Sequence, residues 1–394
     1  MTTLVVAGGT VCADGEWMEA DVIVDALRIT AVEPPEGQRL ASTVDATNCF
    51  VVPGFVDLQL NGAVGVDLTT QPERIGEVAA FLVQCGVTSF MPTVISSSAG
   101  EIAHAIAVMR DWSHDTEPAA RSLGIHLEGP FLNPAKAGAH PLLHLRPPSL
   151  LEAGGWTIET GVAMVTIAPE LPKALDVIEL LTANGVTVCA GHTEATPADI
   201  DAAIASGIRG VTHLFNAMGP LNARVPGPAG AALSDTGLIA GLIVDGIHVD
   251  RAMVRLAWRA LGPHRVALVT DAITALGCPN GAFSIGDTQV VVDDSGARNA
   301  DGVLAGSVLR FDQAVRNLMA FTGCDLAEAS ISASTTPARL AQRHDIGRLV
   351  AGYAADIVVL DANREVVVTI VDGRVVFDPQ GRFDEHDGGP MWKS

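Results

Sequence analysis

The sequence lacks several features that would indicate a membrane, secreted or nucleic-acid-binding protein. It contains no run of 18 continuous apolar residues, so we expect no transmembrane helix. The N-terminus (MTTLVVAGGTVCADGEW) has neither a basic segment nor a long apolar segment, which argues against a signal peptide. Basic residues are scarce: 24 Lys and Arg stand against 45 Asp and Glu, giving a formal net charge of −21. Because nucleic acids and anionic membranes bind basic surfaces, we expect neither as a partner.

Cysteine pairs and charged residues are also sparse. The six cysteines are scattered without a CxxC pair, which favours reduced, mostly buried thiols in a cytoplasmic protein. Charged residues make up 18% of the chain and hydrophobic residues 48%, so a large buried core is expected and disorder is not. A length of 394 residues predicts two domains, or one large domain with an appendage.

The two ends of the chain resemble each other and differ from the middle. Residues 1–53 contain short β-branched runs punctuated by Gly and Pro, and residues 349–394 begin in the same way. Within the second segment, VDGRVVF carries an Asp-Gly turn between apolar runs, which predicts a hairpin. We therefore predict one small β-sandwich domain built from both termini. The final residues, DEHDGGPMWKS, are expected to form a poorly packed tail.

The middle of the chain, residues 54–348, alternates short apolar runs with helical patterns. Several of the helical patterns open with Pro or an Asp or Thr cap and close with Gly. Eight strands alternating with helices predict an α/β fold of the (β/α)8 TIM-barrel type. A doubly wound sheet is the alternative, but it rarely needs eight βα units in succession. The apolar runs cover residues 54–60, 88–94, 122–128, 163–169, 186–192, 210–216, 241–248 and 265–271.

Polar, chemically capable residues stand where these apolar runs end. In a barrel the carboxyl ends of the strands converge on one face, so residues scattered in the sequence become neighbours. One histidine at a strand end would be unremarkable, whereas a Glu, three His and an Asp at five of eight ends indicate a site. The strand-end residues are Gln59, Asn61, Glu128, His192, His213, Asn216, His248 and Asp271.

Three of these residues have the chemistry of a metal site. Glu128, His192 and His213 supply one carboxylate and two imidazoles, a set that suits Zn²⁺ or Fe²⁺ with an open position. Such a cation lowers the pKa of bound water and polarises a carbonyl. Asp271 would face the ligands, where it could take a proton from water and pass it to a leaving group. The structural alternative makes Asp271 the N-cap of the following segment, DAITALG.

The loops after the strands carry further candidates. Taken alone, His140 could be a surface histidine, His248 a helix cap and Arg224 an ordinary exposed arginine. The loop 216–233 is rich in Gly and Pro, and its backbone N–H groups with Arg224 would suit a phosphate. His126 lies two residues before Glu128 on one strand, so both should point inward.

Several segments resemble those of the N-acetylglucosamine-6-phosphate deacetylases, a family within the amidohydrolase superfamily. They follow the family's order over essentially the whole chain; HLEGPF and HLFNAM are specific to it, while PGFVD and ADIVVLD are common across the superfamily. The resemblance implies a metal-dependent barrel with a flanking β domain. It also implies hydrolysis of N-acetylglucosamine 6-phosphate to glucosamine 6-phosphate and acetate, in amino-sugar catabolism or cell-wall recycling. The other matching segments are VVPGFVDLQLNG, VCAGHTEAT, GLIVDGIHVD, LVTDAITALG and LAGSVLRFDQAVRN.

The resemblance also implies roles for individual residues. Glu128, His192 and His213 match the family's metal ligands, and Asp271 matches its general acid/base. Some phosphate contacts in this family can cross a dimer interface, so a homodimer is implied. The positions that match substrate contacts are Ala139, His140, Asn216, Ala217, Arg224, His248, Leu304, Ala305 and Gly306.

The first strand departs from the wider superfamily. Many amidohydrolases carry His-x-His there to hold a second metal, whereas this chain has Gln59 and Asn61. Both are weak, neutral ligands. We therefore expect one firmly held Zn²⁺ or Fe²⁺ per subunit, with Gln59 at most a weak ligand of a second site.

Two other functions are compatible with the sequence. One is an amidohydrolase that acts on another N-acyl compound or a cyclic amide. The other is a catalytically silent barrel that serves as a sugar-phosphate sensor or scaffold, although this chain retains Asp271 and all three ligands. The Pro-rich segment 132–148 is a candidate lid over the site.

Overall fold

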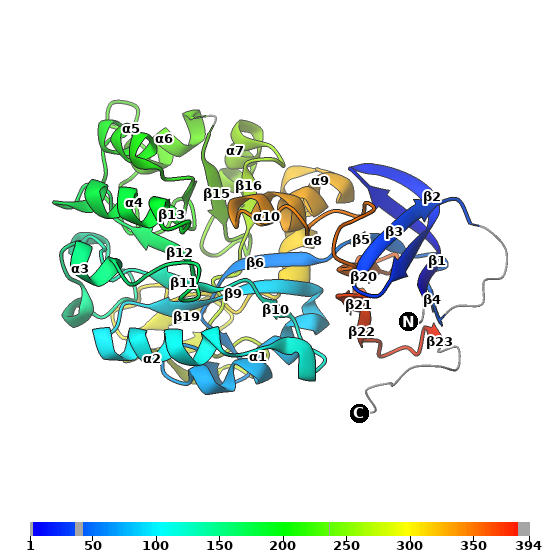
Figure 1. Ribbon diagram of the computed structural model, residues 1–394. Coiled ribbons are helices and arrows are strands. Elements are labelled where there is room, and N and C mark those ends of the chain that lie inside the picture. Colours follow the sequence, from blue (N-terminus) through cyan, green and yellow to red (C-terminus); the bar gives the residue numbers. More distant parts are fainter. Residues whose placement is uncertain (1–2, 36–41, 236, 385–394) are drawn as a thin grey trace.

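The parallel barrel forms the centre of the molecule. The structure is a computed structural model that describes residues 3–35, 42–235 and 237–384 (Figure 1). Within these ranges the eight predicted strands are present, each buried along its length and paired in parallel with its neighbours, so the predicted (β/α)8 fold is confirmed. The strands are β6 (Phe55–Leu60), β9 (Val87–Ile95), β11 (Ile125–Glu128), β12 (Val162–Ile167), β13 (Thr187–Ala190), β14 (Gly210–Val211), β15 (Ile239–Leu242) and β16 (Val266–Leu268).

The ring of strands closes between β6 and the residues that follow β16. The backbone N–H of Asp271 donates to the carbonyl of Gln59 at 2.9 Å, and Leu60 forms a parallel bridge with Ala272. A short strand, β10 (Arg121–Ser122), extends the pairing of β9 at the opposite end of the barrel. Closure therefore occurs where the predicted catalytic aspartate meets the first strand.

Helices cover the outside of the barrel, and local signals set their ends. In α5, Thr196 and Asp199 form a capping box, Pro197 occupies the first helical position, and the helix ends at Gly207 with φ +118°. No helix in the described ranges is long and apolar enough to cross a bilayer. The helices are α1 (Ile75–Leu82), α2 (Ala99–Arg110), α3 (Leu150–Ala153), α4 (Ala174–Ala183), α5 (Pro197–Ser206), α6 (Gly227–Ser234), α7 (Arg251–Leu261), α8 (Phe311–Thr322), α9 (Leu326–Ser330) and α10 (Thr336–Leu340).

A separate β domain combines both ends of the chain, as predicted (Figure 1). The long strand β1 pairs with β2 antiparallel and with β4 and β5 in parallel, and β20 joins the N-terminal strands by pairing with β5. This domain packs around its own apolar core. Its strands are β1 (Leu4–Ala13), β2 (Glu16–Asp25), β3 (Arg28–Glu33), β4 (Ser42–Asp45), β5 (Phe50–Pro53), β20 (Ile357–Leu360), β21 (Val366–Val371), β22 (Arg374–Phe377) and β23 (Phe383–Asp384).

The C-terminal hairpin was predicted from its turn. Strands β21 and β22 pair antiparallel, and the turn residues Asp372 and Gly373 have φ of +47° and +71°, the left-handed values that a two-residue turn requires. Residues 385–394 of the expected tail lie outside the described residues. The predicted domain boundaries fall between β5 and β6 and shortly before β20.

A small antiparallel sheet beside the barrel mouth was not predicted. It consists of β17 (Gly281–Ile285), β18 (Thr288–Asp293) and β19 (Gly296–Asn299). Its first hairpin is fastened at two points, because the Gly286 N–H donates to Asp67 Oδ2 at 2.6 Å and the Thr288 hydroxyl donates to the Ala139 carbonyl at 3.0 Å. A Gly-Asp pair between two β-branched runs was the available sequence signal for this hairpin. A further two-stranded ribbon, β7 (Gly62–Ala63) with β8 (Val66–Asp67), follows β6.

A buried ion cluster joins the barrel to the β domain. Arg121, at the start of the segment leading into β11, contacts both Asp356 and Asp372 of the β domain, the latter at 2.5 Å. His114 lies 3.0 Å from the second carboxylate of the pair. Asp356 is almost fully buried, and burial raises the pKa of its carboxyl despite the neighbouring guanidinium. The interface thus depends on Arg121 to neutralise this carboxylate.

We predict that Arg121→Leu lowers the free energy of unfolding by about 3 kcal/mol, because it leaves a buried carboxylate without its partner. Urea unfolding at pH 7 measures the change. Arg110→Leu is the matched control, since it removes an arginine from an exposed pair with Asp111 and should leave stability nearly unchanged. Equal effects of the two substitutions would contradict the assigned role.

Candidate active site and metal centre

A cavity of about 190 Å³ opens at the carboxyl ends of the barrel strands. Most residues that the sequence marked as candidates contribute to its wall, including all three expected ligands and Asp271. Gln59, Ala305 and Arg224 do not: Gln59 is buried behind the wall. Ala305 is fully buried in the core under the small sheet, and Arg224 is exposed outside the cavity. The wall consists of Asn61, Ile95, Glu128, Gly138, Ala139, His140, His192, His213, Asn216, Ala217, His248, Asp271, Ile285, Val303, Leu304 and Gly306.

Sequence reasoning missed three apolar side chains of this wall. Ile95 ends strand β9, Ile285 comes from the unpredicted sheet, and Val303 lies in the segment after it. An apolar residue at a strand end carries no chemical signal, so only the three-dimensional arrangement identifies these side chains. They give one side of the cavity an apolar surface.

Glu128, His192 and His213 meet at one point. The Oε1 atom of Glu128 lies 3.2 Å from Nε2 of His192 and 3.1 Å from Nε2 of His213. The two histidine Nε2 atoms are themselves 3.1 Å apart, and all three side chains are buried. Two imidazole nitrogens and a carboxylate oxygen this close could hold a cation between them, and a carboxylate with two imidazoles is a common ligand set for a divalent transition metal.

The tautomer of His192 supports this interpretation. Its Nδ1–H donates to the carbonyl of Lys136 at 2.8 Å, which leaves a lone pair on Nε2 directed at Glu128. The N–H of Asn133 in turn donates to the His192 carbonyl at 3.0 Å. The segment 132–148, the candidate lid, is therefore tied to this histidine at its beginning.

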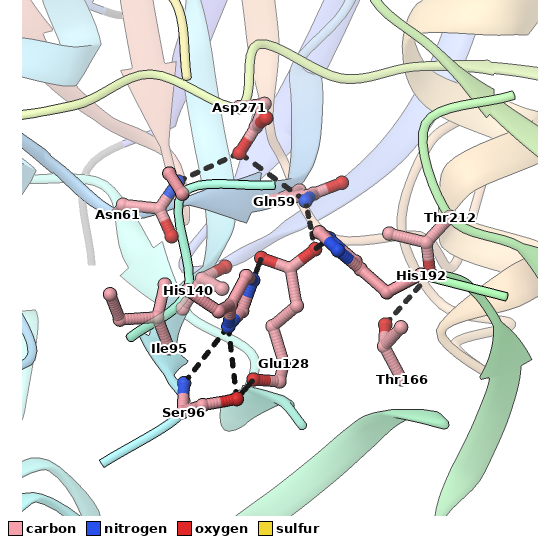
Figure 2. A network of polar contacts seen from close by, with 12 residues as sticks. Gln59, Asn61, Ile95, Ser96, Glu128, His140, Thr166, His192, Thr212 and Asp271 are labelled. Atoms are coloured by element: carbon pink, nitrogen blue, oxygen red, sulfur yellow. Dashed lines mark hydrogen bonds and ion pairs between the residues drawn. The ribbon is translucent and has the colours of Figure 1, made fainter. Parts of the chain in front are cut away.

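His140 also lies within reach of the metal group. Potential ligand atoms of Glu128, His140 and His192 all lie within 4.8 Å of one another. The backbone N–H of Ser96 donates to Nδ1 of His140 at 3.2 Å, so the neutral ring carries its proton on Nε2, 3.6 Å from Glu128 Oε2 (Figure 2). Burial and the neighbouring His192 lower the pKa of His140 to about 4. His140 is thus placed as a hydrogen-bond donor to the cavity, whereas Nε2 of His213 lies closer to Glu128, 3.1 Å from its Oε1 atom.

The charges of the site are mutually dependent. Burial would raise the pKa of Glu128, but the close imidazoles of His140, His192 and His213 outweigh it and hold that pKa well below its usual value. Burial and the negative charge of Glu128 raise the pKa of Asp271 to about 6. Asp271 therefore binds a proton more readily than an ordinary aspartate, as a proton shuttle requires.

Asp271 is not a helix cap. Residues 271–277 form turns rather than a helix, and the side chain instead accepts hydrogen bonds from Asn61 at 2.7 Å and Gln59 at 3.3 Å (Figure 2). His248 is likewise no cap, because Asp250 caps α7. The Nδ1–H of His248 donates to Asp245 at 2.6 Å, so its Nε2 is the ring nitrogen left for the cavity.

Three candidate site residues at strand ends have left-handed backbone conformations. The φ values of His192, His213 and Asp271 are +50°, +27° and +48°. Non-glycine residues adopt such values at a cost of about 1–3 kcal/mol each, and they do so mainly where the surrounding structure enforces them. The turn out of each strand aims the side chain into the cavity rather than along the barrel wall.

A buried series of hydrogen bonds lies inside the barrel, beneath the candidate metal ligands. His126 Nδ1–H donates to the carbonyl of Leu58 at 2.9 Å, which makes Nε2 an acceptor for the Thr166 hydroxyl at 2.8 Å. The Thr166 oxygen then accepts from Thr212 at 2.7 Å (Figure 2). This series of hydrogen bonds includes Thr212, the residue before His213, and His126 on the strand that carries Glu128. It therefore fixes the strands relative to one another just below the candidate metal ligands.

Comparison with known proteins agrees with this geometry. The amidohydrolase family model matches residues 50–376, which is most of the chain. The chain belongs to the amidohydrolase family. The N-acetylglucosamine-6-phosphate deacetylase of Bos taurus is 37% identical over 392 residues, covering 95% of this chain and 94% of its own. The Bacillus subtilis protein of the same name is 34% identical over 334 residues, covering 83% and 84%.

Solved structures of other members of this amidohydrolase family extend the similarity to three dimensions. The N-acetylglucosamine-6-phosphate deacetylase of Thermotoga maritima has a TM-score of 0.88 at 34% identity, covering 95% of this chain and 99% of its own. A mutant of the Mycobacterium smegmatis enzyme in complex with N-acetyl-D-glucosamine-6-phosphate has a TM-score of 0.89 at 32% identity, covering 96% and 100%. The similarity therefore includes both the barrel and the β domain.

We predict that Thr166→Val weakens Zn²⁺ binding by about 10- to 100-fold. Without the Thr166 hydroxyl, His126 Nε2 loses its hydrogen-bond donor and the Thr212 hydroxyl loses its acceptor. Competition with a fluorescent chelator measures the dissociation constant. Thr212→Val removes only the last donor and should have a smaller effect, and Thr166→Ser should restore binding. Wild-type affinity in Thr166→Val would rule out the supporting role.

Proposed function

We propose that this protein hydrolyses the N-acetyl group of N-acetylglucosamine 6-phosphate to give glucosamine 6-phosphate and acetate. The observation that carries the proposal is one cavity in which a Glu128, His192 and His213 group faces Asp271. Deacetylases of that name are more than 30% identical to this chain over most of its length. We assign catalysis to a barrel domain, residues 54–348, and a structural role to the β domain, residues 1–53 and 349–394.

Glu128, His192 and His213 would hold one divalent cation per subunit, zinc or iron, because both metals suit this ligand set. When bound, such a cation polarises the acetyl carbonyl and lowers the pKa of the attacking water. Gln59 presents its amide nitrogen, not its oxygen, to Glu128, and this supports a single metal.

The side chains of the chain itself handle the proton and the developing charge. Asp271 accepts a proton from the attacking water as the carbon–oxygen bond forms. The Nε2–H of His140 then donates to the carbonyl oxygen as negative charge develops there. Asp271 returns the proton to the sugar nitrogen while the carbon–nitrogen bond breaks, which releases the amine and acetate.

The phosphate site is divided between two kinds of residue. His248, Asn216 and Ala217 line the cavity and are assigned to the substrate, together with Ala139, Leu304 and Gly306. Arg224 is exposed, and the apolar side chains of Leu221 and Val225 beside it are also exposed. We infer that this loop contacts a second subunit in a homodimer, where Arg224 would bind the phosphate in the partner's cavity.

The proposed setting is amino-sugar catabolism or cell-wall recycling in the cytoplasm. All six cysteines are free, and five of them are buried, as expected for a chain kept in a reducing compartment. The strong negative charge of the whole chain leaves the anionic substrate to local attraction at the site.

We predict that Asp271→Asn lowers kcat for acetate release by at least about 100-fold while the metal content stays that of the wild type. Glu128→Gln should instead lose the metal, which separates the two roles. Acetate release is measured on N-acetylglucosamine 6-phosphate with and without chelator. Activity on unrelated N-acyl compounds or cyclic amides alone would favour the broader amidohydrolase alternative, and a metal-free, inactive wild type would favour a silent sensor.

We predict that Arg224→Ala lowers kcat/KM for the phosphorylated sugar by about 10- to 100-fold and leaves unphosphorylated N-acetylglucosamine unaffected. Arg209→Ala, at another exposed position, is the control. Mixed dimers of Arg224→Ala with Asp271→Asn subunits should recover activity, because one cavity then has both intact groups. Failure of the mixture to recover would place the arginine in its own subunit's site.

A further inference from the structure

We propose that Asn61, with Gln59 beside it, is a positioning residue that holds the Asp271 carboxylate by one oxygen and leaves the other free to carry the proton. This inference rests on the deacetylation proposed above. It gives a function to the two positions at which many amidohydrolases carry metal-binding histidines. Gln59 lies in β6 and Asn61 follows the last residue of that strand, so the two side chains, two positions apart, point to the same side, where Asn61 lines the cavity.

The hydrogen bonds determine which way the two amides face. Asn61 Nδ2 lies 2.7 Å from Asp271 Oδ1, and Gln59 Nε2 lies 3.3 Å from the same oxygen. Gln59 Nε2 also lies 2.9 Å from Glu128 Oε1. A carbonyl oxygen in either place would face a carboxylate oxygen, which is repulsive, so only the donor ends fit. Figure 2 shows both amides directed at Asp271.

Both amides use Oδ1, and this distinguishes the two oxygens of Asp271. Oδ2 accepts no hydrogen bond from the described residues, and the side chain is only partly buried at the cavity wall. The oxygen without donors is the more basic, so it is the one that receives and returns the proton. A carboxylate held at one end presents this oxygen in a single direction, as proton transfer at a fixed site requires.

The conformation of Asn61 serves this contact rather than the stability of the fold. Its Oδ1 atom is buried without a hydrogen-bond partner among the described residues, which is unfavourable. Its backbone is held independently, because its N–H donates to Ala272 and its carbonyl accepts from Leu68. An apolar side chain of similar size at this position should therefore leave the fold stable but lower the rate of the reaction.

The orientation of Gln59 also bears on the number of metals. A second cation near the first strand would need a lone pair, but the amide presents N–H groups to both carboxylates. The two donors thus neutralise part of the negative charge that a second cation would otherwise balance. The amide pair takes the place of a metal in fixing Asp271.

The test is Asn61→Leu in the full-length, metal-loaded protein. We expect kcat for acetate release to fall at least about tenfold, with KM and metal content within twofold of the wild type. The midpoint of urea unfolding should stay the same or rise, because the unpartnered oxygen is removed. A residue with a merely structural role would lower that midpoint and leave kcat of the folded protein unchanged.

Asn216→Leu is the matched control, since it removes an amide from the same cavity whose hydrogen bonds are accepted by the carbonyls of His213 and Leu214, not by Asp271. It should raise KM more than it lowers kcat. An unchanged kcat in Asn61→Leu, or a fall matched by loss of metal, overturns the proposal. Two further measurements distinguish failure of this proposal from failure of the proposed function. If the wild type releases no acetate, the proposed function is wrong. If a crystal structure of Asn61→Leu shows the Asp271 carboxylate unmoved, the positioning role is wrong.

Discussion

The central constraint on this structure is a carboxylate, Glu128, buried at the mouth of the barrel. A negative charge removed from water must be matched by nearby positive charge and hydrogen-bond donors. Three histidines and the Gln59 amide approach it, each from a different segment of the chain. The strand order of the barrel, the backbone conformations at the strand ends and the attachment of the 132–148 segment all bring these partners to one point. Binding a divalent cation would complete this balance of charge.

Much of the fold could be predicted because the barrel repeats one simple pattern. Buried parallel strands appear as short apolar runs, and their carboxyl ends must share a face, so Glu128, His192 and Asp271 could be grouped before any coordinates existed. The small sheet was missed because its strands interrupt that repeat. Ser96 and Thr166 were missed because their roles depend on which atoms face them. Arg224 shows a further limit, since it was expected at the substrate site but is exposed outside the cavity of the single chain.

The polar residues inside the barrel form two levels with different tasks. The lower level consists of His126, Thr166 and Thr212 and joins the strands. The Leu58 carbonyl accepts a hydrogen bond from His126 Nδ1–H, and this sets the donor and acceptor of each later hydrogen bond in the series. The upper level, next to the cavity, contains the strained backbone of His192, His213 and Asp271 and an unsatisfied oxygen on Asn61. The polar groups of the lower level are hydrogen-bonded, whereas the upper level contains backbone strain and an unpaired oxygen. This arrangement is expected when a stable framework supports a reactive site.

The β domain built from both termini has a consequence for how the chain is made. Strand β5 reaches its final place only when it pairs with β20, about 300 residues later in the sequence. At roughly 5–20 residues per second, a ribosome needs on the order of 15–60 s to synthesise the intervening barrel. During that time the edge of β5 is exposed to other chains, and apolar residues such as Val51 await their core. The β domain therefore cannot be completed until its C-terminal strands have been synthesised.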